Sequence, residues 1–364
     1  MFDRRLILNF DLVLFISILL LCSLGIVNLK SICSSVSESP ATFFNKQIYW
    51  VVAGVFFLFL VININYINIV RYSYYFHAFS IFLLLIVFFF GKTKLGSQRW
   101  ISIGGFSLQP SEFVKITFVL ALSKFFSENI NQKAYTLRDL FFPFLLLSVT
   151  FIPIYVQPDL GTAGIIFLTF ISMIFFLNLN KKSFYPFFSL CAIVMPCLWF
   201  ILKEYQKKRI LIFINPDLDP LRAGYQVIQS QIAVGSGGLL GKGFKMGTQS
   251  QLRFLPEQHT DFVFSVWAEE WGFIGCFFVL ILYFFVFYRG LSIAHNSKNF
   301  YGSFLAIGIS FLFFVQFIIN VFMTIGLFPV VGVTLPFFSY GGSSILSSLF
   351  GVGLILNIGM RKFK

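Results

Sequence analysis

One long hydrophilic segment, residues 203–261, leads to the residue best placed for acid–base chemistry. Asp261 stands where this segment meets a long apolar stretch, directly after His259 and Thr260. A carboxylate at the mouth of a membrane cavity is partly desolvated, which raises its pKa and makes it a better proton acceptor. The sequence therefore predicts a general base at Asp261, with a helix cap as the alternative interpretation.

Three further charged residues lie at the start of apolar runs. Glu112 and Lys115, in QPSEFVKI, are three residues apart and would share one face of a helix. They either form an ion pair that holds helices together or line a polar cavity. Asp159, in QPDLGTAG, directly precedes an apolar run. A helix cap explains it, and a role in a site is the alternative.

Arg99 and Trp100 occur together in the polar run GSQRWISIGG. A tryptophan at the membrane surface with a snorkelling arginine would anchor the chain there. An arginine that binds a phosphate close to a lipid headgroup is the other interpretation.

The glycine-rich run VGSGGLLGKGF is not a nucleotide-binding loop. A P-loop has Gly, four residues and then Gly-Lys-Ser/Thr, but Ser236 takes the first glycine position and Gly243 follows Lys242. The GxGxxG pattern fails because Leu240 occupies its last position. Further on, Glu269 and Glu270 lie in an apolar run, and the sequence offers no partner for either.

The composition is that of a membrane protein. Of the 364 residues, 58% are hydrophobic, 20% are aromatic and 11% are charged, and phenylalanine alone occurs 54 times. Soluble domains carry about a quarter charged residues. A soluble core of this chain length could not bury so much apolar surface, so lipid must cover it.

The net charge of +13 does not indicate nucleic acid as a partner. The basic residues are spread singly along polar segments, without a basic helix or a recognition motif. This distribution is typical of the positive-inside bias and of contact with anionic lipid. The five cysteines and three histidines form no CxxC or HExxH pattern, so no disulfide framework or structural zinc site is predicted.

The predicted fold is all-α: one polytopic domain over residues 1–364 with ten transmembrane helices. Lys and Arg are enriched on the side of both termini, which are therefore predicted to be cytoplasmic. One large extracytoplasmic loop, about 203–261, separates helices 7 and 8. The first apolar run lacks a small-x-small cleavage pattern and is taken as a span. A transmembrane helix needs roughly 17–25 residues, and the apolar runs of about this length lie at approximately 11–29, 48–64, 74–90, 111–126, 140–156, 162–177, 184–202, 262–288, 303–322 and 343–360.

Five sequence blocks occur in order along nearly the whole chain: KQIYW (46–50), GSQRWISIGGFSLQPSEFVKI (96–116), QPDLGTA (157–163), GSGGLLGKGFKMGTQSQLRFLPEQHTDFVF (235–264) and GVTLPFFSYGGSS (332–344). Together they resemble the SEDS family (shape, elongation, division, sporulation) of bacterial cell-wall synthesis. The stretch GTQSQLRFLPEQHTDF is similar to the RodA branch rather than the FtsW branch of division. Arg253 departs from the acidic residue common there, and Trp267 and Trp271 replace smaller aliphatic residues.

The resemblance implies a peptidoglycan glycosyltransferase in the bacterial cytoplasmic membrane that acts in cell elongation. Such an enzyme polymerises lipid II into glycan strands at the outer face and releases undecaprenyl pyrophosphate. It implies a class B penicillin-binding protein and other elongation-complex membrane proteins as partners. It also implies a divalent cation, Mg²⁺ or Mn²⁺, for which the sequence shows no dedicated site. Asp261 matches the family's essential loop carboxylate, and the positions that match its polar cavity are Trp100, Glu112, Lys115, Arg99 and Asp159.

The implied transfer replaces an α-linked pyrophosphate by a β-linked sugar oxygen, so one inversion suffices and Asp261 needs no second carboxylate as nucleophile. The cations available to stabilise the leaving pyrophosphate are Arg99, Lys115, Arg209 and Lys242. A lipid II flippase is the alternative, and it would need a polar path across the membrane midplane. The charges cluster toward the outer half instead. A scaffold that recruits another synthase would not need Asp261 at all.

Overall fold

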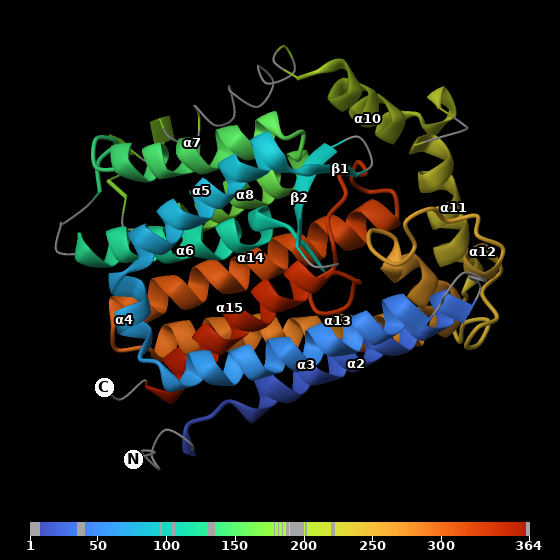
Figure 1. Cartoon of the computed structure of the whole chain (residues 1–364), viewed down its shortest axis with the longest axis horizontal. Helices are drawn as coiled ribbons and strands as arrows, with labels where there is room; N and C mark the ends of the chain where they lie inside the picture. The colour runs from blue at the N-terminus through green and yellow to red at the C-terminus, as the bar shows by residue number, and fades with distance from the viewer. Residues whose placement is uncertain are drawn as a thin grey trace.

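The computed structural model describes residues 8–34, 41–94, 97–103, 106–129, 135–177, 179–180, 182–183, 185–186, 189, 200, 202–219 and 223–361. This part of the chain is almost entirely helical (Figure 1). The long helices are α2 (Leu12–Ser34), α3 (Ala41–Asn63), α5 (Ser73–Phe90), α6 (Pro110–Glu128), α7 (Phe141–Val156), α8 (Leu160–Phe175), α13 (Val263–Asn296), α14 (Phe300–Thr324) and α15 (Gly342–Met360). The shorter ones are α4 (Tyr66–Arg71), α10 (Glu204–Ile214), the 3-10 helix η1 (Pro216–Leu218), α11 (Ala223–Ser236) and α12 (Thr248–Gln251).

Helices lie at nine of the ten positions predicted as spans, as far as the chain is described. The remaining span, 184–202, falls almost wholly outside the described residues. Six helices are long and apolar enough to cross a membrane: α2, α3, α5, α13, α14 and α15. Helices α7 and α8 are apolar but shorter, and α6 has the length but carries four charged residues.

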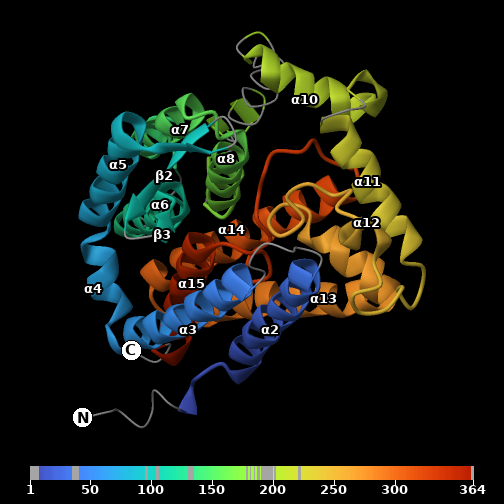
Figure 2. The same ribbon diagram turned by 45° about the vertical axis from the view of Figure 1, so that its right-hand side comes forward.

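Helices α14 and α15 form the centre of the bundle (Figure 2). In α15, 89% of the apolar window is buried, against 28% in α13. Small residues make this possible because they let helix backbones approach closely. At Gly353, for example, a Cβ would lie 3.1 Å from the main-chain oxygen of Leu58 in α3. Helix α14 packs against α13, α6 and α8.

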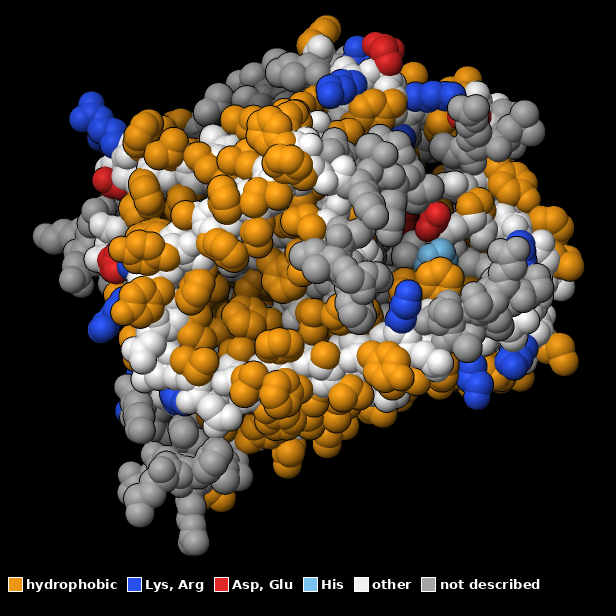
Figure 3. All heavy atoms as spheres, in the orientation of Figure 1, with side chains coloured by type: hydrophobic (Ala, Val, Ile, Leu, Met, Phe, Trp, Pro, Cys, Tyr) orange, Lys and Arg blue, Asp and Glu red, His pale blue; other side chains and the backbone are white. Residues whose placement is uncertain are grey.

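Most of the outer surface of the bundle is apolar. Hydrophobic side chains gather over much of the face in Figure 3, and on α5 the phenylalanines Phe79, Phe82, Phe89 and Phe90 are exposed. Water would not favour such a surface, whereas lipid tails would cover it without cost. The chain is thus a multi-pass membrane protein, as its composition predicts.

Two features depart from the purely helical prediction. Residues 92–108 form a small antiparallel sheet, β1 (Lys92–Lys94), β2 (Ser97–Ile103) and β3 (Phe106–Leu108), in the order β1-β2-β3. Strands this short, set between apolar helices, leave too little periodicity in the sequence to be seen. The segment 203–261 is also largely helical, with α10, η1, α11 and α12 at the end of the molecule opposite the start of α2 and the end of α15 (Figures 1 and 2).

Candidate active site

Asp261 lies in a tight turn between α12 and α13. Its N–H donates to the main-chain oxygen of Glu257 (3.1 Å), which closes the turn. The carboxylate is largely enclosed by protein but still partly accessible. Acidic and histidine side chains lie together in a hollow on the face shown in Figure 3.

Other elements fix the main chain of this turn. Three successive carbonyls each accept a hydrogen bond from a residue distant in sequence, and so does the first carbonyl of α13. The donors are Tyr340 N to His259 O (2.9 Å), Ser339 Oγ to Thr260 O (2.6 Å), Asn320 Nδ2 to Asp261 O (3.0 Å) and Asn28 Nδ2 to Val263 O (2.9 Å). The turn therefore has one defined conformation.

The electrostatic setting of Asp261 suits a base. Burial and the negative charge of Glu257 raise its pKa to about 6, and Arg209, Thr260 and Arg99 counteract part of that shift. The cations close enough to stabilise its charge are thus Arg209 and Arg99. A carboxyl group with this pKa is ionised at pH 7 and remains a competent proton acceptor.

Arg209 is held over the site by α10. Its Nη1 donates to the main-chain oxygen of Val330 (2.8 Å). Loss of hydration on burial lowers the pKa of its guanidinium, and the like charge of Arg99 lowers it further. The negative charge of Asp261 opposes this change. Two arginines and Asp261 are therefore within electrostatic reach of one another, which is an arrangement that can bind an anion.

Arg99, in β2, is fixed by the turn before α8. Its Nη1 lies 3.5 Å from Oδ1 of Asp159, and its other nitrogens donate to the main-chain oxygens of Gln157 (3.2 Å) and Pro158. Asp159 also caps α8 by accepting from the N–H of Thr162 (3.2 Å). Asp159 is thus both a helix cap and the partner that orients Arg99. Trp100, the next residue in β2, is half-buried and stands opposite Lys92 of β1.

Glu112 and Lys115 form the predicted ion pair, with 2.9 Å between Nζ and Oε1 and both side chains nearly inaccessible. The pair lies within α6 rather than between two helices. Ser347 of α15 reaches Oε2 of Glu112 (3.4 Å), which extends the polar contact to the central helix. Among the contacts described, none links this pair directly to Asp261.

Lys242 does not join the group around Asp261. Its ammonium lies 2.7 Å from Oε1 of Glu269, which is completely buried in α13. The hydroxyl of Thr248 and the N–H of Gln249 donate to the same oxygen (both 3.0 Å). Glu269, for which the sequence suggested no role, therefore fastens the glycine-rich run to α13. Its neighbour Glu270 accepts a hydrogen bond from Ser31 of α2.

The glycine-rich run fits a break in α13 at Gly272, where φ is +62°. Such a break leaves main-chain groups without helical partners. The glycine-rich run provides these partners. Its N–H groups donate to α13 in the bonds Lys242 N to Glu269 O (3.0 Å) and Gly243 N to Glu270 O (3.0 Å), and its carbonyls accept in the bonds Phe273 N to Gly238 O (2.9 Å) and Ile274 N to Leu239 O (3.1 Å). A Cβ on Gly241 or Gly272 would collide with the opposing main chain. Close packing therefore explains these glycines.

Sequence reasoning missed four residues that shape the site: Glu257, Asn320, Ser339 and Gln47. Gln47 Nε2 donates to Ser339 O (3.1 Å) and so supports the segment that holds Thr260. Three of the four lie within the blocks quoted above for the family resemblance. Asn320 gives a different signal, a polar residue inside the apolar run FIINVF, which is costly in a membrane without a partner.

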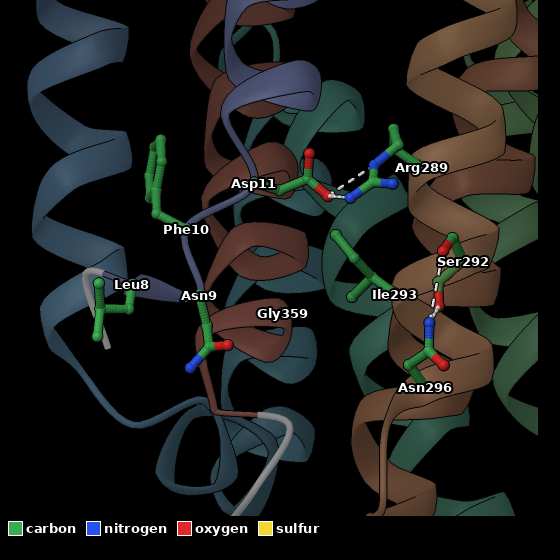
Figure 4. A pocket seen from close by; sticks show the side chains of 9 residues that line it. All are labelled: Leu8, Asn9, Phe10, Asp11, Arg289, Ser292, Ile293, Asn296 and Gly359. Carbon is green, nitrogen blue, oxygen red and sulfur yellow. Dashed lines mark hydrogen bonds and ion pairs between the residues drawn. The ribbon is translucent and has the colours of Figure 1, made fainter. Parts of the chain in front are cut away.

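A polar cavity outside the candidate site lies near the C-terminal end of α13, the end away from Asp261 (Figure 4). It has a volume of about 210 Å³ and contains Asp11 and Arg289, whose Nη2 and Oδ2 atoms are 2.6 Å apart. Asp11 also accepts from the N–H of Leu14 (3.0 Å), so it caps α2. This ion pair ties α2 to α13 some 28 residues along the chain from Asp261, and it lies outside the candidate site.

The comparisons with known proteins agree with this architecture. Residues 4–364 match the family described as cell cycle protein, FtsW/RodA/SpoVE. Peptidoglycan glycosyltransferase MrdB of Escherichia coli (strain K12) is 40% identical over 290 residues, which cover 78% of this chain and 76% of that protein. Stage V sporulation protein E of Bacillus subtilis (strain 168) is 38% identical over 356 residues, covering 96% of each.

Solved structures show the same fold. A chain from a structure on the coordination of polymerization and crosslinking by a peptidoglycan synthase complex matches with a TM-score of 0.82 and 29% identity, over 98% of this chain and 99% of that one. Rod shape determining protein RodA of Thermus thermophilus matches with a TM-score of 0.72 and 25% identity, over 98% of each chain. The resemblance drawn from the five sequence blocks is thereby confirmed, and the chain belongs to the FtsW/RodA/SpoVE family of cell cycle proteins.

Proposed function

We propose that the chain is a peptidoglycan glycosyltransferase that polymerises lipid II into glycan strands. The observation that carries the proposal is the setting of Asp261, a largely enclosed carboxylate whose pKa is raised to about 6 and which lies within electrostatic reach of Arg209 and Arg99. A base beside two cations is what an inverting transfer from a pyrophosphate requires. The names of relatives such as MrdB, a peptidoglycan glycosyltransferase, support the same activity.

In the proposed reaction, Asp261 accepts the proton of the acceptor 4-hydroxyl as its oxygen bonds to C1 of the donor sugar. The bond between C1 and the pyrophosphate oxygen breaks, and undecaprenyl pyrophosphate leaves with the electron pair. Positioned general bases contribute about 10²–10⁴-fold to such rates. Arg99 and Arg209 would stabilise the charge on the leaving group, and Asp159 would keep Arg99 in place.

The other predicted site residues have different supports. Trp100 neighbours Arg99 on β2 and would contact the lipid-linked sugar. Glu112 and Lys115 would line the polar interior of the bundle as a buried ion pair whose charges cancel. A direct substrate contact by Lys242 is the least supported assignment because its ammonium is already bound to Glu269 and Thr248. We therefore assign Lys242 to the support of α13.

A divalent cation, Mg²⁺ or Mn²⁺, fits this site only with help from the substrate. Within the described residues, no cluster of three or more His, Cys, Asp or Glu could hold a metal. Mg²⁺ commonly binds through one or two carboxylates together with phosphate oxygens. The described residues thus offer the ion no site of their own, and the pyrophosphate oxygens of the substrate would carry it, where it would neutralise charge on the leaving group.

The proposed setting is the bacterial cytoplasmic membrane, with ten spans, cytoplasmic termini and the segment 203–261 on the outer side. Helices α10, α11 and α12 of this segment lie at the end of the molecule away from both chain ends (Figures 1 and 2), which supports a topology with the segment and the termini on opposite sides of the membrane. A class B penicillin-binding protein that cross-links the strands is the proposed partner, together with other elongation-complex proteins. The match to a chain of a peptidoglycan synthase complex supports such a partnership.

Purified protein supplied with labelled lipid II and Mg²⁺ or Mn²⁺, alone and with a class B partner, tests the activity. A ladder of glycan strands on a gel is the expected result. A lipid II flippase is the competing function, so the same preparation is reconstituted in liposomes and assayed for lipid II translocation. Translocation without any ladder, partner included, would contradict the proposal.

A further inference from the structure

Asn320 is a completely buried polar residue near the C-terminal end of α14, within the otherwise apolar run 317–322. Its Nδ2 donates to two main-chain oxygens, those of Asp261 (3.0 Å) and Val333 (2.6 Å). Both N–H groups of the amide are therefore used. The reversed amide would place its oxygen against two carbonyl oxygens, so these two acceptors fix the orientation of the side chain.

Val333 belongs to a segment, residues 330–333, that contacts Asp261 and Arg209 as well as Asn320. Gly332, with φ at +73°, lies so close that a Cβ on it would be 3.4 Å from Oδ2 of Asp261. Val330 accepts the hydrogen bond from Arg209 (2.8 Å). The segment thus joins the candidate base to the candidate cation, and Asn320 ties it to the main chain of Asp261.

We infer that Asn320 is a positioning residue that holds the Asp261 carboxylate at a set place relative to Arg209. The inference rests on the proposed glycosyltransferase function wherever turnover is measured. Asn320 touches no reacting atom in this role, so its loss changes the alignment of Asp261 with Arg209 and removes no group that itself contacts the substrate. A misplacement of about 1 Å in a reacting group costs roughly 10²-fold in rate.

Asn357 of α15 provides a matched control. It is equally buried, and its Nδ2 donates to the main-chain oxygens of Val61 (2.6 Å) and Ile64 (2.5 Å). It lies about 22 Å along α15 from Gly342, away from the turn that carries Asp261. Asn320→Leu and Asn357→Leu each remove an amide that donates to two main-chain oxygens, one beside the base and one remote from it. Asn357→Leu also removes the acceptor of a hydrogen bond from Arg361, so the control loses at least as many contacts.

The test measures kcat and KM for lipid II across a range of pH, and hydrogen exchange of the folded proteins. For Asn320→Leu we expect kcat to fall roughly 10- to 100-fold, with KM little changed. The acid limb of its pH–rate profile should be displaced from that of the wild type. Amide hydrogen exchange should be faster in residues 257–262 and 330–334. Asn357→Leu should keep the wild-type pH profile and the wild-type exchange in both segments. If Asn320→Leu does not fold, Asn320→Ala, which removes both donors without adding a charge, carries the same expectation.

Two kinetic results would overturn the inference: wild-type kcat and pH profile in the Asn320 variant, or equal changes in the two asparagine variants. The exchange measurement does not depend on activity. A wild-type protein that makes no glycan would contradict the proposed function, and unchanged exchange in 257–262 on loss of Asn320 would separately overturn the positioning role.

Discussion

Asp261 owes its chemical character to the groups around it. An exposed aspartate has a pKa near 3.9 and is a weak base. Here burial and the charge of Glu257 raise the pKa to about 6, while Arg209 and Arg99 prevent a larger rise. The site thus balances a neighbouring carboxylate against two arginines, and each of these charges can be removed singly.

Removal of the Glu257 charge should extend activity to lower pH. Asp261 accepts a proton only when ionised, so wild-type turnover should fall as the pH drops through about 6. Glu257→Gln removes a negative charge that raises this pKa, so the acid limb of the pH–rate profile should move to lower pH. The profile of glycan synthesis measures the shift.

Arg209→Gln is the matched change of opposite sign. It removes a positive charge that lowers the pKa of Asp261, so the acid limb should move to higher pH. Lower turnover at every pH is also expected because the pyrophosphate loses a cation. Shifts of the two limbs in the same direction would be inconsistent with Asp261 as the titrating base.

At the scale of elements, the break in α13 links the glycine-rich run to the helix that follows Asp261. Residues 263–271 form the first part of α13. Near the end of this part, the buried carboxylate of Glu269 pairs with Lys242 of the glycine-rich run. The Lys242–Glu269 contact differs from most surface ion pairs because one partner is fully enclosed. Its loss would leave a buried charge with fewer partners.

Lys242→Met should therefore destabilise the protein by about 3 kcal/mol, the low end for an uncompensated buried charge, because Thr248 and Gln249 still donate to Glu269. Lys208→Met is the control. It breaks a pair with Asp219 (2.8 Å) in which Lys208 is 56% exposed, and such pairs contribute less than about 1 kcal/mol. Thermal unfolding in detergent compares the two. Equal unfolding temperatures for both variants would contradict a stabilising role of the Lys242–Glu269 contact.

Across the whole molecule, the long apolar helices could be predicted from sequence because lipid requires about twenty apolar residues per span. The sheet in 92–108 and the helices in 203–261 could not, since short elements leave weak periodic signals. The position of Asp261 just before α13 and the contact between Glu112 and Lys115 could be predicted because both depend on residues close together in the sequence. The partner of Lys242 and the role of Asn320 could not, because they depend on contacts between segments 27 and 59 residues apart.

The orientation in the membrane yields a prediction for accessibility. Leu240, in the glycine-rich run, and Lys298, between α13 and α14, are both exposed, and the proposed topology puts them on opposite sides. In a background whose native cysteines are replaced by serine, Leu240→Cys should react with an impermeant maleimide on intact spheroplasts. Lys298→Cys should react only after lysis. Labelling in the reverse order would contradict cytoplasmic termini.

The central claim is that Asp261 is the base of a glycan polymerase, and one paired assay addresses it most directly. Wild-type protein, Asp261→Asn and Asp219→Asn are compared for lipid II polymerisation with their class B partner after each is shown to fold. Asp219 is the control because its carboxylate pairs with Lys208 in the same segment, 203–261. We expect Asp261→Asn to lose about 10²–10⁴-fold in rate and Asp219→Asn to retain the wild-type ladder. A wild-type ladder from Asp261→Asn would remove this residue from the chemistry.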